Sequence, residues 1–403
     1  MDRIYFMDKL IITRLQGKTC TVRISGGEVL QLTFEEEQEK SLLGNIYIAK
    51  VQKVAAGINA AFVELAPGMV GYYSLEENKE HLFTTPSSTG GIPRKLKAGD
   101  EIVVQVSRDA VKTKAPVVTS HLSFAGRYCV LTAGKSGIGF SSKLTDNGLR
   151  TELKMRWKEC APGDMGLIVR TNAAAVTADE VLKEYEALKE TYEALKAGWA
   201  MRTCYSCIYH ALPGYIASLR DTLFGGLDSI LTDQPDFYEA ISAYLSSFQP
   251  EDKERLSFYE DRLLPLSKLY SLDTALERAL SKRVWLKSGG YLVIEPTEAM
   301  VVIDVNTGKY TGKKSQEETI VKINLEAADE IGRQLRLRNL SGIILIDFID
   351  MEKELHKKQV MEALQRAVSK DPVKTVVVEM TRLNLVEVTR KKVRKPLYEQ
   401  ILL

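Results

Sequence analysis

The spacing of apolar and polar residues changes along the chain, and each spacing predicts a different element. From residue 44 to residue 77, short alternating runs are broken by Gly57 and by Pro67 with Gly68. Short strands separated by such turns are typical of a small barrel. Before them, the double glycine in Ser25–Glu28 predicts a turn between two strands. This part of the chain is therefore expected to consist of β-strands.

The middle of the chain has a longer period. Between residues 177 and 199, apolar residues recur at steps of three and four, and Thr177 with Glu180 forms a capping box. Together these signals predict an amphipathic helix whose apolar face packs in a core rather than binding a ligand. Further helices are predicted near residues 236–248 and 272–286. The apolar face of the first helix comprises Val181, Tyr185, Leu188, Tyr192, Leu195 and Trp199.

The last third combines both patterns. Residues 289–308 predict two strands, residues 314–340 a long helix, and residues 341–351 a third strand. The third strand is expected to be buried, because its apolar residues run unbroken from Ile343 to Ile346. A strand, a helix and a strand in this order predict a right-handed parallel crossover.

Polar side chains end two of these strands. Asp304 and Asn306 close the run VVIDVNTG, and Asp347 closes the third strand. Because the carboxyl ends of parallel strands share one sheet edge, the two carboxylates are expected to converge there. They repel each other unless a hard cation such as Mg²⁺ lies between them, and Asn306 faces the same way as Asp304. A strand-end aspartate also commonly caps a turn or a helix, so metal catalysis and capping both stay open.

Composition narrows the class of protein without deciding its partner. The 403 residues are 45% hydrophobic and 27% charged, which predicts a folded protein of several domains. The net charge of +2 does not by itself predict a polyanionic ligand. Basic residues do gather at Arg333, Arg336 and Arg338 and in the segment RKKVRK, residues 390–395. Beside the carboxylates they suit a phosphodiester backbone, while a solvated helix end and a C-terminal tail are the alternatives.

The apolar runs and the cysteines exclude other classes. No run approaches the length of about 20 residues that a membrane-spanning helix needs, and the charged start lacks the apolar core of a signal peptide. We therefore expect no membrane segment and a cytoplasmic location. Five scattered cysteines fit reduced thiols. Cys204 and Cys207 form a CxxC without a second pair, and they are expected to be a buried pair rather than a metal site.

Four stretches together closely resemble the bacterial ribonuclease E/G family. They occur in the family's order and spacing, and the resemblance covers essentially the whole chain. The block from NLEAADEI to DFIDM is the most specific of them. The stretches are NAAFVELAPGMVGYYSLEE, DMGLIVRT, IDVNTGKYTG and NLEAADEIGRQLRLRNLSGIILIDFIDM.

The resemblance implies an α/β multidomain protein. An RNase H-like subdomain would be split between residues 1–42 and residues 207–282, with an S1 (OB-fold) RNA-binding barrel inserted at residues 43–122. A 5′ sensor region would occupy residues 123–206, and a DNase I-like α/β catalytic subdomain would occupy residues 283–403.

The resemblance also implies a reaction. Asp304 and Asp347 match the metal-binding aspartates of the family, and Asn306 matches its catalytic asparagine. Together with Mg²⁺ they would cleave single-stranded RNA to products with 5′-phosphate and 3′-hydroxyl ends, in rRNA and tRNA processing and in mRNA decay. The chain would then be an endoribonuclease.

Two further RNA-contacting sites are implied. The RNA-binding surface of the barrel matches Phe62, Tyr72 and Lys114, two aromatics that stack bases and one cation for the backbone. Taken alone, Phe62 would be expected in a core. The pocket that senses a 5′-phosphate matches Gly126, Val130, Arg170, Thr171 and Lys374, the last at a position where the family has an arginine.

The end of the chain departs from the family's pattern. It stops at EQILL, about where a CPxC zinc-link motif would begin. We therefore expect no structural zinc, and a homodimer or higher homo-oligomer that is weakened without the link. The alternative function is an RNA-binding module with little turnover, and the shorter, G-like form of the family is favoured over the E-like form.

Overall fold

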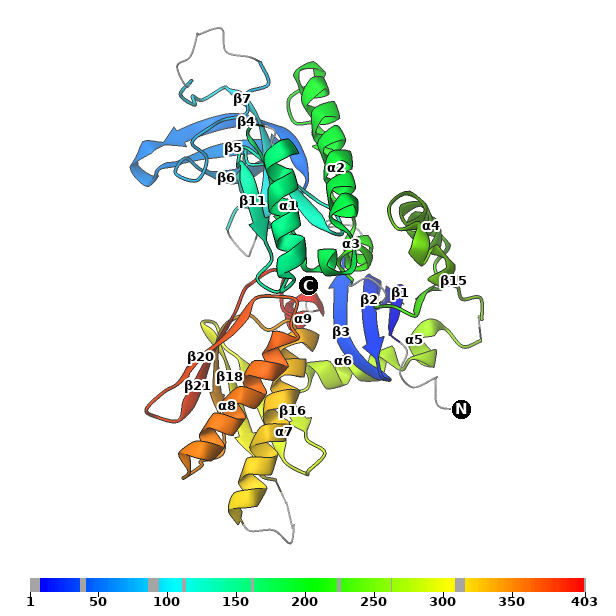
Figure 1. Ribbon diagram of the computed structural model, residues 1–403, viewed down its shortest axis with the longest axis vertical. Coiled ribbons are helices and arrows are strands. Elements are labelled where there is room, and N and C mark those ends of the chain that lie inside the picture. The colour runs from blue at the N-terminus through cyan, green and yellow to red at the C-terminus, as the bar shows by residue number, and fades with distance from the viewer. Residues whose placement is uncertain are drawn as a thin grey trace. The chain divides into compact units, whose positions relative to one another are not determined.

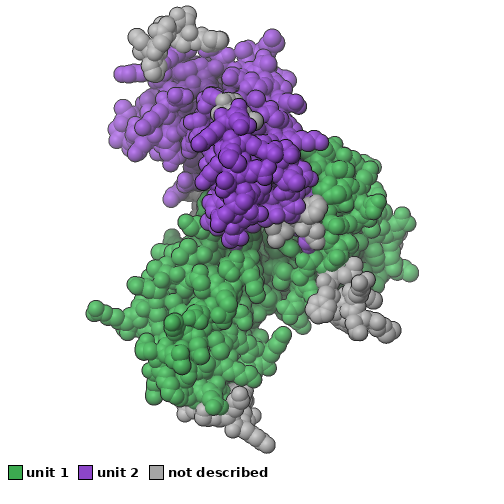
Figure 2. All heavy atoms as spheres, in the orientation of Figure 1, with its two compact units in different colours: residues 1–37, 227–403 green, residues 38–226 purple. Residues whose placement is uncertain are grey.

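The computed structural model describes residues 8–36, 41–85, 94–110, 114–160, 163–222, 226–261, 263–308 and 316–401. The chain divides into two compact units (Figures 1 and 2). Unit 1 comprises Met1–Glu37 and Leu227–Leu403, and unit 2 comprises Gln38–Gly226. Within the described ranges, no helix is long and apolar enough to cross a membrane.

Unit 2 contains a closed barrel. Its strands are β4 (Ile46–Ala55), β5 (Ala60–Ala66), β6 (Met69–Ser74), β7 (Glu101–Arg108) and β8 (Val117–Thr119). They follow the order β4-β5-β6-β8-β7, and β4 also pairs with β7, which closes the barrel. Alternate side chains such as Val63 and Tyr73 fill the interior. Gly68, with a φ of 81°, turns β5 into β6. The small barrel predicted from the short alternating runs is confirmed, and it is consistent with an S1 (OB-fold) subdomain.

A second sheet of unit 2 has the order β11-β12-β10-β9. The capping box is confirmed, since the Glu180 N–H donates to Thr177 Oγ1 and the Thr177 N–H donates to the Glu180 carboxylate. Tyr185 and Tyr192 of the predicted apolar face lie in the core. The strands are β9 (Ser123–Ala125), β10 (Cys129–Ala133), β11 (Gly137–Phe140) and β12 (Met165–Val169), and the helices are α1 (Asn147–Cys160) and α2 (Ala178–Gly198).

Two short elements complete unit 2. Strand β13 (Cys207–Tyr209) pairs with β4, and α3 (Gly214–Asp221) follows it. The predicted subdomain boundary at residue 207 stays a prediction. Cys204 and Cys207, which were expected to be a buried pair, are both only half-buried. Cys207 begins β13, the outermost strand beside β4, and Cys204 lies in the turn before it. Partial burial still raises the pKa of both thiols.

The first sheet of unit 1 joins two distant segments of the chain. Its order is β15-β14-β1-β2-β3, with β14 parallel to both β1 and β15. The predicted turn in Ser25–Glu28 joins β2 to β3 through two glycines with positive φ. The assignment of an RNase H-like subdomain stays a prediction. The elements are β1 (Lys9–Leu15), β2 (Lys18–Ser25), β3 (Glu28–Glu35), β14 (Ser229–Thr232), β15 (Leu256–Phe258), α4 (Pro235–Phe248), α5 (Leu266–Leu269) and α6 (Leu272–Leu280).

The second sheet of unit 1 carries the predicted crossover. Its order is β16-β17-β18-β19-β21-β20, and β18 is parallel to β19, as predicted. Helices α7 and α8 lie side by side over one face (Figure 1) and supply its core. The DNase I-like assignment stays a prediction. The elements are β16 (Arg283–Trp285), β17 (Tyr291–Pro296), β18 (Met300–Asn306), β19 (Gly342–Asp347), β20 (Thr375–Met380), β21 (Leu385–Arg390), α7 (Gln316–Leu337), α8 (Glu354–Ser369) and α9 (Leu397–Ile401).

Two expectations for this region were wrong. The helix expected over residues 272–286 ends at Leu280, and residues 283–285 form the edge strand β16. Strand β19 was expected to be buried on both faces, but Ile343 is 52% exposed. The helices cover only one face of this sheet, so the other face of β19 is open to solvent.

Candidate active site

Asp304 and Asp347 lie side by side at the carboxyl ends of β18 and β19. They are register partners in the parallel pair, where neighbouring backbones lie about 4.8 Å apart. Asp304 is half-buried and Asp347 is exposed. Both point away from the helix-covered face, because their neighbours Ile303 and Ile346 are fully buried in the core. The convergence predicted from the strand ends is therefore present in the structure.

Asn306 belongs to the same cluster. Its Nδ2 donates a hydrogen bond of 2.7 Å to Asp304 Oδ2. This bond fixes the orientation of the Asp304 carboxylate and satisfies one of its oxygens. The amide keeps a second N–H and its carbonyl oxygen for another partner.

The charge at this edge is not balanced. Although the Asp347 side chain is exposed, its carboxyl group is partly shielded from water, and this desolvation raises its pKa; the nearby Asp304 and Asp350 carboxylates add to the effect. Within the described part of the chain, no Lys, Arg or His side chain forms an ion pair with Asp304 or Asp347. A cation bound between the two carboxylates would relieve the repulsion.

The donor set fits a hard cation that keeps part of its water shell. Among the described residues, no group of three or more His, Cys, Asp or Glu side chains could hold a metal ion. An ion at this edge would therefore take two carboxylates, and water and substrate oxygens would complete its coordination. Mg²⁺ is commonly bound in this way.

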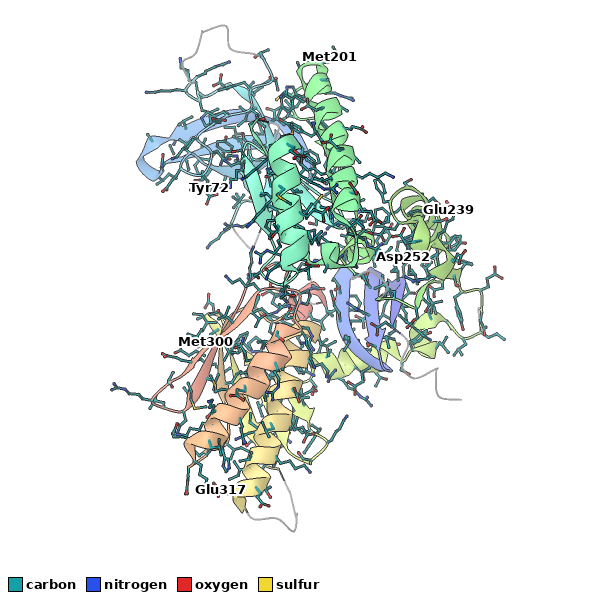
Figure 3. All side chains as sticks on the ribbon, in the orientation of Figure 1. Tyr72, Met201, Glu239, Asp252, Met300 and Glu317 are labelled. Atoms are coloured by element: carbon teal, nitrogen blue, oxygen red, sulfur yellow. The ribbon has the colours of Figure 1, made fainter. Side chains whose placement is uncertain are left out.

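The helices fix the loop that follows Asp347. Asn324, fully buried in α7, accepts a bond from the Ile349 N–H and donates one of 2.8 Å to the Ile349 carbonyl. Lys353 pairs with Glu317, which Figure 3 shows in the first turn of α7. Asn324 was not predicted from the sequence, where its one signal is an amide between apolar residues of a helix.

The arginines at the end of α7 serve the fold. Arg333 pairs with Glu330, Arg336 donates to the Ala367 carbonyl, and Arg338 is 6% exposed and donates to Gln334. Burial lowers the pKa of Arg338 to about 10. Arg338 is therefore buried away from a ligand, whereas Arg333 and Arg336 are partly exposed, and the RNA-facing cluster stays a prediction.

The RKKVRK segment divides into the buried Arg390, the half-buried Arg394 and four exposed residues. Arg390 is 5% exposed and forms an ion pair of 2.8 Å with the buried Asp371. It also donates to Asn339 and to the Leu340 carbonyl. This residue stabilises the fold and is unavailable to a ligand.

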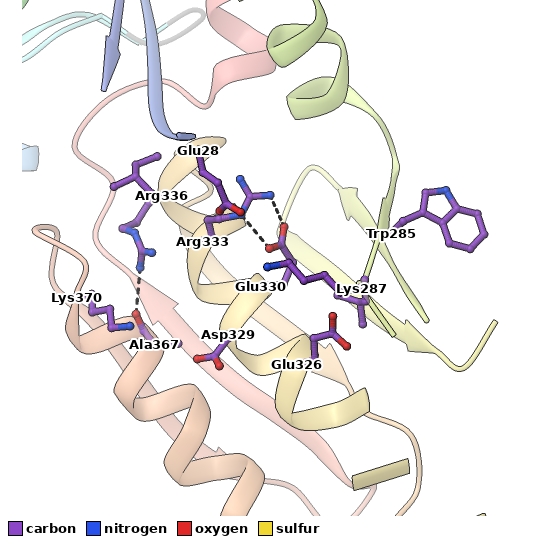
Figure 4. A pocket seen from close by; sticks show the side chains of 12 residues that line it. Glu28, Trp285, Lys287, Glu326, Asp329, Glu330, Arg333, Arg336, Ala367 and Lys370 are labelled. Atoms are coloured by element: carbon purple, nitrogen blue, oxygen red, sulfur yellow. Dashed lines mark hydrogen bonds and ion pairs between the residues drawn. The ribbon is translucent and has the colours of Figure 1, made fainter. Parts of the chain in front are cut away.

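A pocket of about 540 Å³ lies apart from the carboxylate cluster (Figure 4). Its wall carries both charges, with Glu326 and Asp329 from α7 near Arg333, which already pairs with Glu330. Asp304, Asn306 and Asp347 do not line it. The candidate active site is therefore an open sheet face rather than this pocket.

The barrel brings Phe62 and Tyr72 together. They are cross-strand partners on β5 and β6, and their ring centroids lie 6.3 Å apart in an edge-to-face arrangement. Both are half-buried and alternate with the buried Val63 and Tyr73, so they lie on the outer face of the barrel, where Figure 3 labels Tyr72. Lys114 is exposed and precedes Pro116, whose carbonyl accepts from the Tyr72 N–H.

Of the residues matched to a phosphate sensor, Gly126 and Thr171 lie next to Arg170. Its Nη1 donates to the Gly126 carbonyl at 2.6 Å, and its Nη2 donates to Asp221 Oδ1 at 2.7 Å. Thr171 shares a hydrogen bond of 2.9 Å with Ser141. Val130 lies half-buried on β10. Lys374 belongs to unit 1 and is exposed just before β20.

Two carboxylates of this region were not predicted from the sequence. Glu184 in α2 accepts from the N–H groups of Arg127, Tyr128 and Cys129, and it fills the space where a side chain at Gly126 would lie. Asp221 ends α3 and pairs with Arg170. Glu184 lies 55 to 57 residues from its partners and Asp221 lies 51 residues from Arg170, so no local pattern pointed to them.

Comparison with known proteins shows which chains share these segments. The model of the Ribonuclease E/G family matches residues 123–393. Ribonuclease G of Escherichia coli (strain K12) is 34% identical over 394 residues, covering 96% of this chain and 80% of that protein. Ribonuclease E of Nostoc sp. (strain PCC 7120) is 32% identical over 379 residues, covering 91% of this chain and 55% of that protein.

Proposed function

Because the chain belongs to the ribonuclease E/G family and is an endoribonuclease of that type, we propose that it hydrolyses single-stranded RNA at the β18–β19 edge. The reaction would depend on Mg²⁺ and leave 5′-phosphate and 3′-hydroxyl ends. The observation that carries this proposal is the register pairing of Asp304 with Asp347 beside Asn306 on an open sheet face. Processing of rRNA and tRNA and decay of mRNA are the roles that such an activity would serve.

Each residue of the cluster has a distinct task. Asp304 and Asp347 would hold Mg²⁺, an ion that lowers the pKa of a bound water and neutralises phosphate charge. Asn306 keeps the Asp304 carboxylate in one orientation through its 2.7 Å hydrogen bond. The raised pKa of Asp347 means that protons compete with a cation for this carboxylate more strongly than at an ordinary aspartate.

Two surfaces of unit 2 would bind the rest of the RNA. Phe62 and Tyr72 present adjacent rings on the outer face of the barrel, and base stacking on aromatic rings suits single-stranded RNA. Arg170 offers a forked guanidinium to a 5′-monophosphate, and the Thr171 hydroxyl lies next to it in the chain. Gly126 and Val130 are the other proposed sensor residues of unit 2. Lys374 belongs to unit 1, and its part in the sensor stays an expectation from the family resemblance.

Cleavage of a short RNA with a 5′-monophosphate tests the catalytic assignment. The unchanged chain is compared with Asp304→Asn, with Mg²⁺ present or chelated. We expect chelation and the substitution each to lower cleavage by at least about 100-fold, because direct ligands matter at least as much as outer-shell partners.

The matched control is Asp329→Asn, which removes an exposed carboxylate of α7 outside the cluster. It should cleave like the unchanged chain. Cleavage that survives both chelation and Asp304→Asn would overturn the proposed site and its metal.

A further inference from the structure

An aromatic and cationic cluster lies on the same open sheet face as the candidate active site. Trp285 on the edge strand β16 is 62% exposed, whereas Trp157 and Trp199 are 6% and 9% exposed. Its ring centroid lies 5.2 Å from that of Tyr291 on β17. The Arg283 guanidinium lies 4.5 Å from the Tyr291 centroid and 5.7 Å from that of Trp285. We call Arg283, Trp285 and Tyr291 the β16–β17 cluster.

The strand register aligns this cluster with the catalytic residues. Trp285 pairs with Tyr291, and Tyr291 pairs with Asn306. These three residues therefore form one row across the sheet. At a strand spacing of about 4.8 Å, the row places Trp285 about 10 Å from Asn306.

A second row runs parallel to the first. Arg283 pairs with Val293, Val293 pairs with Asp304, and Asp304 pairs with Asp347. All four side chains alternate with neighbours that pack in or against the helix-covered core, such as Val284 and Ile303. The guanidinium thus lies on the same face as the carboxylates, two strands away from Asp304.

The chemistry of the cluster suits a polyanion with flat bases. Exposed aromatic faces stack bases irrespective of their identity, and a guanidinium both stacks and neutralises phosphate. Within the described ranges, no carboxylate forms an ion pair with Arg283. The charge of Arg283 is therefore available to a ligand, in contrast to the carboxylate-paired Arg333 and Arg390.

We propose that the β16–β17 cluster is a base-stacking subsite for single-stranded RNA beside the scissile phosphate. Trp285 stacks a base within about two nucleotides of the cut, and Arg283 neutralises the backbone next to it. The proposal rests on the proposed function, because the rows link the cluster to Asp304 and Asn306. A protein partner on this face would need no such alignment with the carboxylates.

The first experiment measures kcat/KM for a 5′-monophosphorylated RNA with Mg²⁺. Trp285→Ala should lower kcat/KM by about 5- to 100-fold, and Trp285→Phe should retain most of the activity. The control is Phe248→Ala, which removes a 68% exposed aromatic of α4 in the same unit. An RNA with an abasic nucleotide beside the cut should be cleaved by the unchanged chain with a kcat/KM lower by a similar factor. Trp285→Ala should cleave the abasic RNA and the normal RNA with the same kcat/KM.

The second experiment separates RNA binding from cleavage. In the Asp304→Asn background, titration with the same RNA should quench tryptophan fluorescence, because Trp285 is exposed while Trp157 and Trp199 are buried. The quenching should be largely lost when Trp285→Phe is added. Quenching without cleavage by the unchanged chain would contradict the proposed reaction and leave the subsite standing.

Three results would overturn the subsite. One is cleavage by Trp285→Ala at the rate of the unchanged chain. Another is a lower melting temperature of Trp285→Ala together with the same fold loss of activity on normal RNA and on abasic RNA. That result would show that Trp285 has a structural role. The third is a molecular mass of Trp285→Ala in light scattering that differs from that of the unchanged chain, while RNA cleavage is unaltered. That result would show that the face binds a second copy of the chain.

Discussion

The β18–β19 edge and the surroundings of Arg170 balance charge in opposite ways. At the edge, Asp304 and Asp347 face each other without a cationic partner among the described residues, and the pKa of Asp347 is raised. Around Arg170, the guanidinium already pairs with Asp221. Burial by itself would raise the pKa of Asp221, but the hydrogen bond and charge of Arg220, together with Arg170, lower it.

This difference determines what binding requires at each place. A surplus of negative charge attracts a cation directly, and among the residues that the structure describes no cationic partner has to be displaced. A 5′-phosphate can reach the donors of Arg170 only by competing with Asp221 or by using the donors that Asp221 leaves free. We therefore expect the edge to be indispensable for cleavage and the Arg170 site to modulate it.

The largest effect is expected from a third carboxylate at the edge. Asn306→Asp replaces the donor to Asp304 with a like charge, and it should lower kcat/KM by about 10- to 100-fold. Asn306→Ala removes the donor without adding charge and should cost less. The measurement is cleavage of 5′-monophosphorylated RNA at saturating Mg²⁺.

The control for the added charge is Gln359→Glu on the exposed side of α8. It makes the same chemical change away from the edge and should leave kcat/KM unchanged. If Asn306→Asp cleaves RNA as fast as the unchanged chain, charge at the β18–β19 edge does not limit cleavage, and the proposed difference between the edge and the Arg170 site is wrong.

The edge could be predicted from the sequence because its causes are local. Strand patterning, a single crossover helix and the rule that parallel carboxyl ends share an edge are enough to bring Asp304 and Asp347 together. The Arg170 site depends instead on Gly126 and Asp221, which lie 44 and 51 residues away. Pairings of this length leave no periodic trace in a single sequence.

Burial explains the other differences between prediction and structure. The RKKVRK segment looked like one basic patch, but Arg390 pairs with Asp371 in the interior, and a charged residue gives no sign of this in the sequence. Ile343 looked buried because an apolar run does not reveal which face of a sheet helices cover. The end of α6 at Leu280 was missed because residues 281–286 continue without glycine or proline.

A smaller effect is expected at Arg170. Arg170→Gln should lower the ratio of cleavage rates for 5′-monophosphorylated and 5′-hydroxyl RNA by about five- to tenfold, because the charge-assisted donors are lost. The ratio is measured with two RNAs that differ only at the 5′ end. Arg202→Gln, an exposed arginine of the same unit, is the control and should not alter the ratio. If the ratio of cleavage rates is unchanged in Arg170→Gln, Arg170 does not sense the 5′-phosphate and the proposed sensor is wrong.

Asp221→Asn should shift the same ratio in the other direction. It frees Arg170 from its competing carboxylate, so the preference for a 5′-monophosphate should rise by about two- to threefold, a modest gain typical of a partly exposed ion pair. A fall in the ratio would mean that Asp221 orients the guanidinium for the phosphate rather than competing with it.

The smallest effect concerns stability and its pH dependence. The folded-state pKa of Asp347 is raised, so this carboxyl group destabilises the fold above its unfolded-state pKa, and the penalty disappears as the pH falls below that value. Without divalent cations at pH 7, Asp347→Asn should therefore raise the free energy of unfolding by less than about 1 kcal/mol, because the side chain is exposed. The gain should vanish near pH 3, where the native aspartate is protonated, and melting temperatures in a chelating buffer at both pH values measure it.

Saturating Mg²⁺ should reverse the order of stability at pH 7 and make the unchanged chain the more stable one, since only the unchanged chain keeps both carboxylates for the ion. A variant that is less stable than the unchanged chain in the chelating buffer would show that the two edge carboxylates are not in conflict, and the contrast with the neutralised Arg170 site would then fail.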